Sequence, residues 1–432
     1  MTYPLLAGVW ATLLAMAYVE TRRRSPALLF ALALLIAAGV PATIYLFGDA
    51  YGAAVVEQAV LYIILFNLLY LVTRLLLPGP AVVPDPSERQ GPPAPSRAER
   101  RLVLLVGAVF ALAFVLKLAD SGFSLDRLLN SSWRENLTVT YVLILYCAHA
   151  SFGIVLCLFI WRRYPLALLS LVAAVVLVVL DRRRVMGLGA VAPLLLYMIF
   201  WSLRGRRRFG KIALTVTAGG LALLGFYVVQ QIRYFGPLTA AASAEPGFVF
   251  RAALLHITSL QGDLSLLEPF LWMIDNGHYV DGFGELVTVR RMLLFWLPSG
   301  FKPPEFTHSI AAAIRGGGEG ASLHPTIYGL SWGEALWFGV LYAPFLAVVF
   351  RVLDGLLVRF RGALTWALLM GPYTVFAVTA ARGNMQTAWV VMIVTMGGLF
   401  ALRAMSRAAG GGPTYLQPLP HGPPIRNARA AD

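Results

Sequence analysis

The residues in this chain with the clearest chemical potential are basic residues that stand in unexpected places. Arg182–Arg184 interrupt a long apolar region, and Arg382 follows another apolar stretch in the segment AARGNMQ. A long polar segment contains Arg290, Arg291 and Lys302. An arginine guanidinium presents a fixed fork of donors that matches phosphate oxygens. For one such residue, contact with lipid headgroups is the simpler explanation, but the set together predicts a shared anionic ligand.

Other chemistries lack their residue patterns. The sequence has no G-x-x-x-x-G-K-[ST], D-x-D or H-E-x-x-H motif, and its histidines show no metal-ligand spacing. Cys147 and Cys157 fall on one predicted helix, about 15 Å apart along its axis, so they cannot form a disulfide. Glu57 is the one acidic residue expected inside an apolar stretch, whereas proton-coupled carriers depend on such acids. We therefore expect an anionic ligand and no nucleotide, metal or cofactor.

The elements that must position these residues are membrane helices. Of 432 residues, 59% are hydrophobic and only 13% are charged, whereas a soluble domain has about 25% charged residues. The apolar residues fall in blocks of about 15–25, the length that crosses a hydrocarbon core of about 30 Å as a helix. We expect an all-α, polytopic membrane helical bundle of about eleven transmembrane helices. The predicted spans are 4–20, 26–47, 53–76, 102–118, 139–161, 165–180, 186–203, 212–232, 335–353, 363–380 and 388–403.

Lysines and arginines predict the orientation of these spans. The main basic clusters all fall on one side of such a bundle, which the positive-inside rule assigns to the cytoplasm. The clusters lie at 22–24, 97–101, 162–163, 204–211 and 351–361 and after Arg403. The N-terminus is then outside and the C-terminus inside. The formal net charge of +14 follows mostly from this topology, so it does not indicate nucleic-acid binding.

The span pattern also divides the chain into regions. They are an N-terminal bundle at 1–232 with a Pro-rich cytoplasmic linker at 78–100, an extracytoplasmic loop at 233–334, C-terminal spans at 335–403 and a disordered cytoplasmic tail at 404–432. A connection as long as this loop is usually functional. Helical apolar spacing predicts amphipathic helices within it at 249–274 and 284–297. Its glycine-rich part, IRGGGEGASLH, is typical of a mobile substrate loop, although a plain flexible connector has the same composition.

Two stretches of the loop resemble the Wzy family, the O-antigen and exopolysaccharide repeat-unit polymerases. LLFWLPSGFKPP (293–304) matches the W-P-x-K-P-like segment of that family at Trp296, Pro298, Lys302 and Pro303. ASLHPTIYGLSWGEALWFGVL (321–341) matches a second family segment at Pro325, Thr326, Gly329 and Gly339. The glutamate of that second segment would fall on Leu330. Glu334 lies about one helical turn further on, near the same helix face.

The resemblance implies a GT-C-like glycosyltransferase in the inner membrane of a bacterium. Such an enzyme polymerises undecaprenyl-pyrophosphate-linked oligosaccharides at the periplasmic face, without a metal and with inversion, to build lipopolysaccharide or exopolysaccharide. Basic residues would stabilise the leaving pyrophosphate. The residues assigned to it are Arg182, Arg183, Arg184, Arg290, Arg291, Lys302 and Arg382. The implied partners are membrane lipid, a flippase and a chain-length regulator.

The same chemistry needs a base that accepts the proton of the attacking hydroxyl. His324 is the first choice, Glu334 the second and Glu319 the third. Contacts with the rest of the substrate are assigned to Arg315, Trp296 and Tyr328.

Other functions stay open from sequence alone. An O-antigen ligase or another lipid-linked glycan transferase would share both the architecture and the arginine chemistry. A peptidoglycan polymerase of the SEDS type is less favoured, because the outer loop has no aspartate in a recognisable context. A lipid or polysaccharide transporter usually has an internal repeat, coupling acids and a midplane site, whereas this chain places its polar residues on one face.

Overall fold

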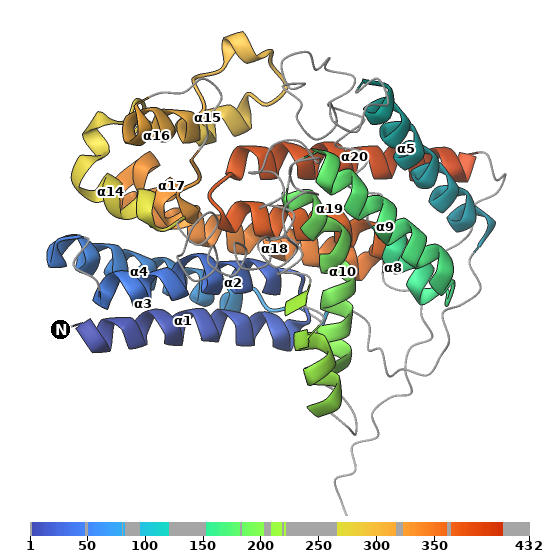
Figure 1. The fold of residues 1–432 in the computed structure, drawn as a ribbon, viewed down its shortest axis with the longest axis horizontal. Helices are drawn as coiled ribbons and strands as arrows, with labels where there is room; N and C mark the ends of the chain where they lie inside the picture. Colours follow the sequence, from blue (N-terminus) through green and yellow to red (C-terminus); the bar gives the residue numbers. More distant parts are fainter. Residues whose placement is uncertain are drawn as a thin grey trace, which may run out of the picture.

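The computed structural model describes residues 2–47, 51–79, 81–82, 96–120, 153–181, 184–202, 209–217, 220–221, 266–316, 323–360 and 364–408. Within these ranges every regular element is a helix (Figure 1), as the apolar blocks predict. The N-terminal elements are α1 (Thr2–Arg23), α2 (Leu28–Leu34), the π-helical turn η1 (Leu35–Gly39), α3 (Val40–Phe47), α4 (Ala53–Leu76), α5 (Arg97–Asp120), α8 (Gly153–Ile160), α9 (Tyr164–Asp181) and α10 (Arg184–Ser202). The C-terminal elements are α14 (Glu268–Asn276), η4 (Gly277–Tyr279), α15 (Val287–Leu293), η5 (Ser299–Phe301), α16 (Phe306–Arg315), α17 (Thr326–Ala335), η6 (Leu336–Leu341), α18 (Tyr342–Arg359), α19 (Leu364–Ala381) and α20 (Met385–Ala408).

α4 illustrates why these helices suit a membrane. One stripe of the helix, which includes Phe66 and Tyr70, is buried where α4 packs against α1 and α18. The opposite face is also apolar, and it exposes leucines such as Leu61 and Leu68. A helix that is apolar all round needs to be covered on every side. Lipid can cover the face that no other helix contacts.

Among the described residues, five helical stretches are long and apolar enough to cross a membrane, by length and composition. They are Pro4–Arg23, Leu28–Tyr45, Ala53–Leu76, Thr326–Arg359 and Met385–Ser406. Shorter apolar helices at Tyr164–Ala173, Val191–Phe200 and Thr365–Ala381 coincide with further predicted spans. The predicted spans at 139–161 and 212–232 lie largely outside the described residues. A helical membrane protein is therefore supported, while the count of about eleven spans stays a prediction.

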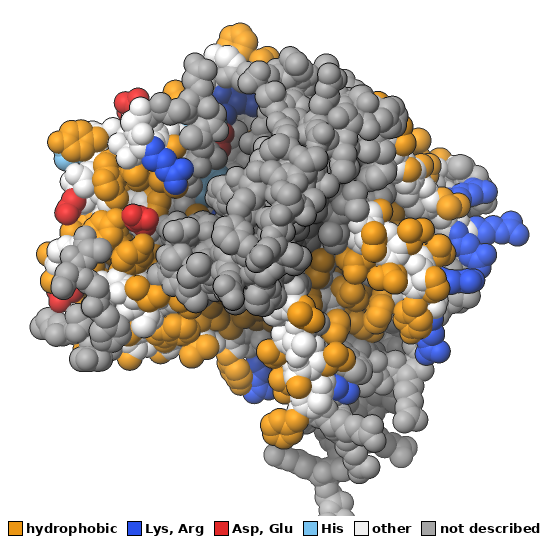
Figure 2. Space-filling model, in the orientation of Figure 1, with side chains coloured by type: hydrophobic (Ala, Val, Ile, Leu, Met, Phe, Trp, Pro, Cys, Tyr) orange, Lys and Arg blue, Asp and Glu red, His pale blue; other side chains and the backbone are white. Residues whose placement is uncertain are grey.

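The two ends of the bundle differ in charge. Helices α14–α17 lie over the end where α1 begins, which we call the loop end (Figure 1). On the face drawn in Figure 2, acidic side chains gather over α14–α16, whereas many lysine and arginine side chains lie toward the opposite end. Which end faces the cytoplasm stays a prediction.

The junction between the loop and the following span differs from its predicted position. The span was expected to begin at 335, but the helix begins at Thr326, and α17 is buried almost throughout. The backbone at Leu336 has a φ of 51°, which interrupts the helix before η6 and α18 continue. Gly329, inside α17, allows close packing of this helix. A Cβ added to Gly329 would lie 2.8 Å from the Cβ of Phe270, so α17 and α14 approach closely.

The described part of the loop contains shorter helices than expected, together with one helix that was not predicted. The predicted helix 284–297 is helical only over α15, and only the end of the predicted helix 249–274 is described, as part of α14. α16 was missed by sequence reasoning. Its signal is an apolar repeat at Phe306, Ile310 and Ile314, followed by Gly316 with a φ of +74° at the end of the helix.

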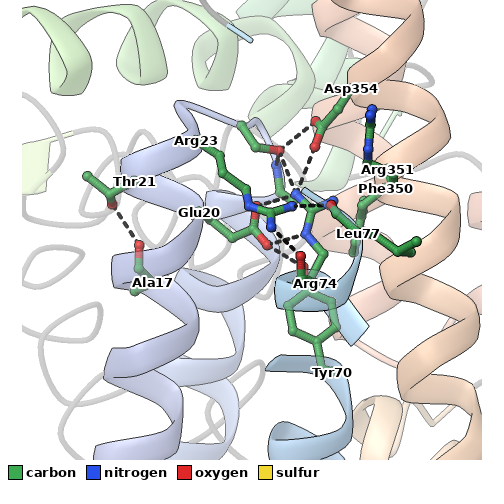
Figure 3. Close-up of polar contacts among 12 residues, drawn as sticks. Ala17, Glu20, Thr21, Arg23, Tyr70, Arg74, Leu77, Phe350, Arg351 and Asp354 are labelled. Carbon is green, nitrogen blue, oxygen red and sulfur yellow. Dashed lines mark hydrogen bonds and ion pairs between the residues drawn. The ribbon is translucent and has the colours of Figure 1, made fainter. Parts of the chain in front are cut away.

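A buried ion network joins α1, α4 and α18 (Figure 3), and Tyr373 adds α19 to it. Arg74 on α4 donates from Nε and Nη2 to the two carboxylate oxygens of Glu20 on α1, at 2.7 and 2.5 Å. The same Nη2 donates to Asp354 Oδ2 on α18 at 2.8 Å. The hydroxyl of Tyr70 donates to Glu20, and that of Tyr373 on α19 donates to Asp354, each at 2.8 Å. Helices distant in the sequence are therefore joined through one guanidinium.

Arg23 completes the buried ion network at the end of α4. Its guanidinium donates to the carbonyl oxygens of Arg74 and Leu77 (Figure 3). These are carbonyls that a helix end leaves without an intrahelical partner. With Arg23 included, the network holds two basic and two acidic side chains, so it is formally neutral. Removing ions from water costs several kcal/mol each, and this reciprocal pairing offsets that cost.

The acids of this network were missed by sequence reasoning. Glu57 was the one intramembrane acid expected; Glu20 is the last residue of the predicted span 4–20, and Asp354 directly follows the predicted span 335–353. In the structure Glu20 and Asp354 lie inside candidate membrane spans, and both are buried. Glu57 is only half-buried near the start of α4. An apolar window cannot reveal a charge at its edge whose partner lies on another helix.

Candidate anion-binding site

The turn between α19 and α20 is built by Arg382, Gly383 and Asn384. The amides of Gly383 and Asn384 donate to carbonyls in the last turn of α19, at 2.9 and 3.2 Å, and Gly383 has a φ of +82°. This is the bond pattern of a helix that ends with a left-handed glycine. The Asn384 side chain then accepts the amide of Thr387 at 3.2 Å and caps α20. The sequence RGN therefore ends one helix, starts the next and fixes the backbone position of Arg382.

Arg291 on α15 links the loop to the first turn of α20. Its Nε donates to Oε1 of Gln386, and its Nη1 donates to the carbonyl of Pro303. Partial burial lowers the pKa of the Arg291 guanidinium, an effect that the charge of Glu305 opposes. Among the described residues, Arg291 forms no ion pair. The hydrogen-bond acceptors of its guanidinium are therefore uncharged oxygens.

Lys302 is a second cation near Arg291. Its Nζ donates to the carbonyl of Phe295 at 2.9 Å. Burial, and then the charge of Arg291, lower the pKa of the Lys302 ammonium. In the part of the chain that the structure describes, Lys302 also forms no ion pair. Two neighbouring cations repel each other, and an anion bound beside both would relieve that repulsion.

The segment before α17 brings His324 toward the same turn. The amide of Leu323 donates to the carbonyl of Thr307 on α16 at 3.0 Å, which fixes the segment against the loop. A Cβ added to Gly383 would lie 2.2 Å from the carbonyl oxygen of Thr326. Only glycine permits this approach, so the turn at Arg382 contacts the start of α17. His324 lies between these two anchored points and is half-buried.

These contacts define one polar region, which we call the loop-end cluster. Its members are half-buried and come from the loop, the segment before α17 and the α19–α20 turn. They are Arg291, Lys302, His324, Arg382 and Gln386. Gln386 was not singled out from the sequence. Its signal is a polar side chain in the first turn of an apolar span, directly after the RGN turn.

Glu334, the second choice for the base, is buried at the end of α17 and bonded to the start of α15. Its side chain is fully buried, and its carboxylate oxygens accept the amide of Thr288 at 2.8 and 3.0 Å. The Glu334 carbonyl also accepts the amide of Leu286 at 3.2 Å. Leu286 and Thr288 flank the start of α15, so Glu334 holds the helix that carries Arg291. We therefore treat Glu334 as a positioning residue.

Two other residues assigned to ligand contact are not members of the loop-end cluster, because one is exposed and the other is fully buried. Arg290 is exposed and pairs with the exposed Glu285 at 3.7 Å. Tyr328, expected at the substrate surface, is fully buried in α17, and its hydroxyl donates to Asn67 Oδ1 on α4 at 2.8 Å. This burial makes Tyr328 a core residue, because the helix begins earlier than predicted.

The remaining residues assigned from the sequence are either exposed or outside the described residues. Arg315 is exposed at the last turn of α16, and Trp296 is exposed after α15. Arg182, Arg183 and Glu319 lie outside the described residues, as does the side chain of Arg184. Of the basic residues assigned from the sequence, the structure thus brings together Arg291, Lys302 and the turn of Arg382.

No protein-family model, curated protein or solved structure matches this chain. The resemblance to the Wzy family therefore depends on the motif residues alone. Within those motifs, the part from Thr326 to Glu334 is buried and serves mainly helix packing, whereas Lys302 belongs to the loop-end cluster.

Proposed function

We propose that this protein is a membrane glycosyltransferase that joins undecaprenyl-pyrophosphate-linked oligosaccharide repeat units at the outer face of a bacterial inner membrane. The observation that carries the proposal is the loop-end cluster, where Arg291 and Lys302 lie near each other without an ion pair among the described residues. Partly buried cations of this kind favour an anionic ligand. A pyrophosphate supplies several charged oxygens for the guanidinium fork and the ammonium.

In the proposed reaction, a hydroxyl of one repeat unit attacks the anomeric carbon of the other chain, at the sugar that carries undecaprenyl pyrophosphate. A carbon–oxygen bond to the acceptor forms while the bond from the same carbon to the pyrophosphate oxygen breaks, with inversion. Undecaprenyl pyrophosphate leaves as an anion. Cations fixed beside the leaving oxygen stabilise the charge that develops there.

His324 is the favoured acceptor of the hydroxyl proton. A neutral imidazole can take a proton near neutral pH. His324 is half-buried and stands two residues before Thr326, whose carbonyl oxygen lies against Gly383. Glu334 suits this role less well, because its carboxylate is buried and bonded to the amide of Thr288. The cations and the proposed base would then come from different segments of the chain.

Deleting the gene in its host tests the proposal. We expect surface or secreted glycan to shrink to single repeat units that are still made and exported, as seen by gel electrophoresis and lipid extraction. Long lipid-linked chains without attachment to lipid A would instead identify a ligase. Unchanged glycan with altered passage of a solute would identify a transporter, and either result would reject the polymerase.

Complementation of the deletion then tests the site. Arg382→Lys keeps the charge but removes the guanidinium fork, so we expect membranes with this variant to make little polymer. Arg22→Lys is the matched control, because Arg22 is exposed at the last turn of α1 and is assigned to no ligand. Full polymer from Arg382→Lys, at equal protein level, would remove Arg382 from the site.

A further inference from the structure

The segment 293–302, between α15 and α16, exposes large apolar side chains outside the membrane-length helices. The exposed fractions of Leu293, Trp296 and Phe301 are 70%, 69% and 75%. In Figure 1 the chain after α15 projects sideways from the bundle, and Figure 2 shows hydrophobic side chains at its tip. An aqueous surface rarely carries such side chains together without a partner.

Contacts at both ends of this segment fix its level along the bundle. Arg291, just before the segment, donates to Gln386 and also to the carbonyl of Pro303, just after it. Gln386 lies in the first turn of the candidate span Met385–Ser406. The segment therefore emerges at the level where a membrane-crossing helix ends. That level is the boundary between hydrocarbon and headgroups, where Trp and other aromatic residues concentrate.

Internal hydrogen bonds order the backbone of the segment. The Lys302 ammonium donates to the Phe295 carbonyl at 2.9 Å, and the amide of Phe301 donates to the Pro298 carbonyl at 3.1 Å. The amide of Leu297 donates to the Leu294 carbonyl at 3.0 Å. With these polar groups bonded within the turn, the backbone can approach lipid at a smaller desolvation cost.

Charge complementarity selects the occupant of this surface. Arg290 lies on α15 next to the segment with 56% of its side chain exposed, and its pair with Glu285 is long and solvated. Exposed pairs of this kind contribute little and are easily exchanged. A basic side chain beside exposed aromatic residues matches a surface that carries phosphates above hydrocarbon.

We propose that the segment 293–302 is an interfacial anchor that inserts Trp296 and Phe301 into the headgroup region of the bilayer at the loop end, with Arg290 against lipid phosphates. The anchor would hold α15, and with it Arg291, at a constant depth. This interaction goes beyond the proposed glycan chemistry and does not depend on it, because a transporter would need the same lipid contact.

Site-specific fluorescence tests the anchor in the full-length protein. Trp296→Cys and Phe301→Cys are labelled with the environment-sensitive dye NBD in a Cys147→Ala, Cys157→Ala background. The proteins are placed in phosphatidylcholine–phosphatidylglycerol nanodiscs that do or do not contain doxyl-labelled lipid. Ala312→Cys is the matched control, because it lies between His308 and Arg315 on the exposed face of α16.

We expect doxyl lipid to quench NBD at positions 296 and 301 and aqueous iodide to quench it weakly there. At position 312 we expect iodide to quench NBD more strongly than doxyl lipid does. Strong iodide quenching at 296 and 301 without lipid quenching would place the segment in water and reject the anchor. Protection from both quenchers would mean that protein covers the segment, which also rejects it. Neither reading involves glycan synthesis, so the result is separate from the fate of the proposed function.

Discussion

The buried ion network and the loop-end cluster both gather charged side chains from distant parts of the chain, but they balance charge differently. In the network, Arg74 is fully buried and bonded to the carboxylates of Glu20 and Asp354. In the loop-end cluster, Arg291 and Lys302 are half-buried and bonded to carbonyl and amide oxygens instead. The first region is neutral without a ligand, whereas the second leaves positive charge that a ligand can use.

This difference separates a structural use of arginine from a proposed functional one. A buried pair is expensive to break because the remaining partner is left as an unpaired ion. A half-buried cation bonded to neutral groups can exchange those partners for an anion at a smaller cost. Charge balance and burial therefore distinguish the two regions better than the presence of arginine does.

Breaking the network should give the largest effect. Arg74→Met leaves the carboxylates of Glu20 and Asp354 buried without their cation. We expect the free energy of unfolding to fall by about 3–5 kcal/mol, measured by thermal unfolding in detergent with gel filtration. The matched control is Arg74→Met combined with Glu20→Gln and Asp354→Asn, which should recover much of the lost stability. Equal instability of the single and triple variants would contradict an electrostatic origin.

Changing the loop-end cluster should reduce activity without unfolding the protein. Loss of one preorganised donor typically reduces a rate about 100–1000-fold, so we expect Arg291→Lys to lose most polymer formation at a nearly unchanged unfolding temperature. Arg290→Lys is the neighbouring control and should be almost silent, because Arg290 is exposed. Polymer yield and unfolding temperature are measured on the same membranes. Comparable losses for both variants would remove the distinction between these two arginines.

Glu334 offers a smaller effect that separates positioning from proton transfer. A glutamine at this position can still accept the amide of Thr288, whereas alanine cannot. We expect Glu334→Gln to keep most activity and Glu334→Ala to lose about 10–100-fold, because a displacement of about 1 Å can cost this much. A catalytic base would be lost equally in both variants. Equal loss in two folded variants, measured as polymer made by membranes, would therefore restore Glu334 as the base.

The smallest expected effect is a pH dependence at Lys302. Burial and the charge of Arg291 lower the pKa of its ammonium from the ordinary value of 10.5. Below that pKa the ammonium is charged and can bind an anion; as pH rises through it, the charge is lost. We expect the affinity for inorganic pyrophosphate, measured by calorimetry, to weaken as the pH rises. The decline should come at a lower pH than the titration of an ordinary lysine. In Lys302→Arg the decline should move to higher pH, and identical profiles would exclude Lys302.

The sequence by itself determined the all-helical class and where most of the apolar helices of membrane-crossing length lie. The predicted span 53–76 coincides with α4, because apolar composition and length respond to the bilayer rather than to tertiary contacts. The sequence also placed the RGN segment between two spans, and it forms the turn after α19, since Gly383 and Asn384 act through local backbone geometry. The basic residues of the loop-end cluster were singled out because they stand apart from the apolar helices.

Only the tertiary structure decided which charged residues meet. Arg74 and Asp354 are distant in the sequence, and no periodicity indicates that they bond. The same holds for Arg291 with Gln386 and for Glu334 with Thr288. The early start of α17 also depends on packing, because Gly329 and Gly333 allow Phe270 and Phe306 to lie against the helix. Local sequence pattern indicates which face of one helix is apolar. A buried charge depends on an oppositely charged partner from another helix, which local pattern does not indicate.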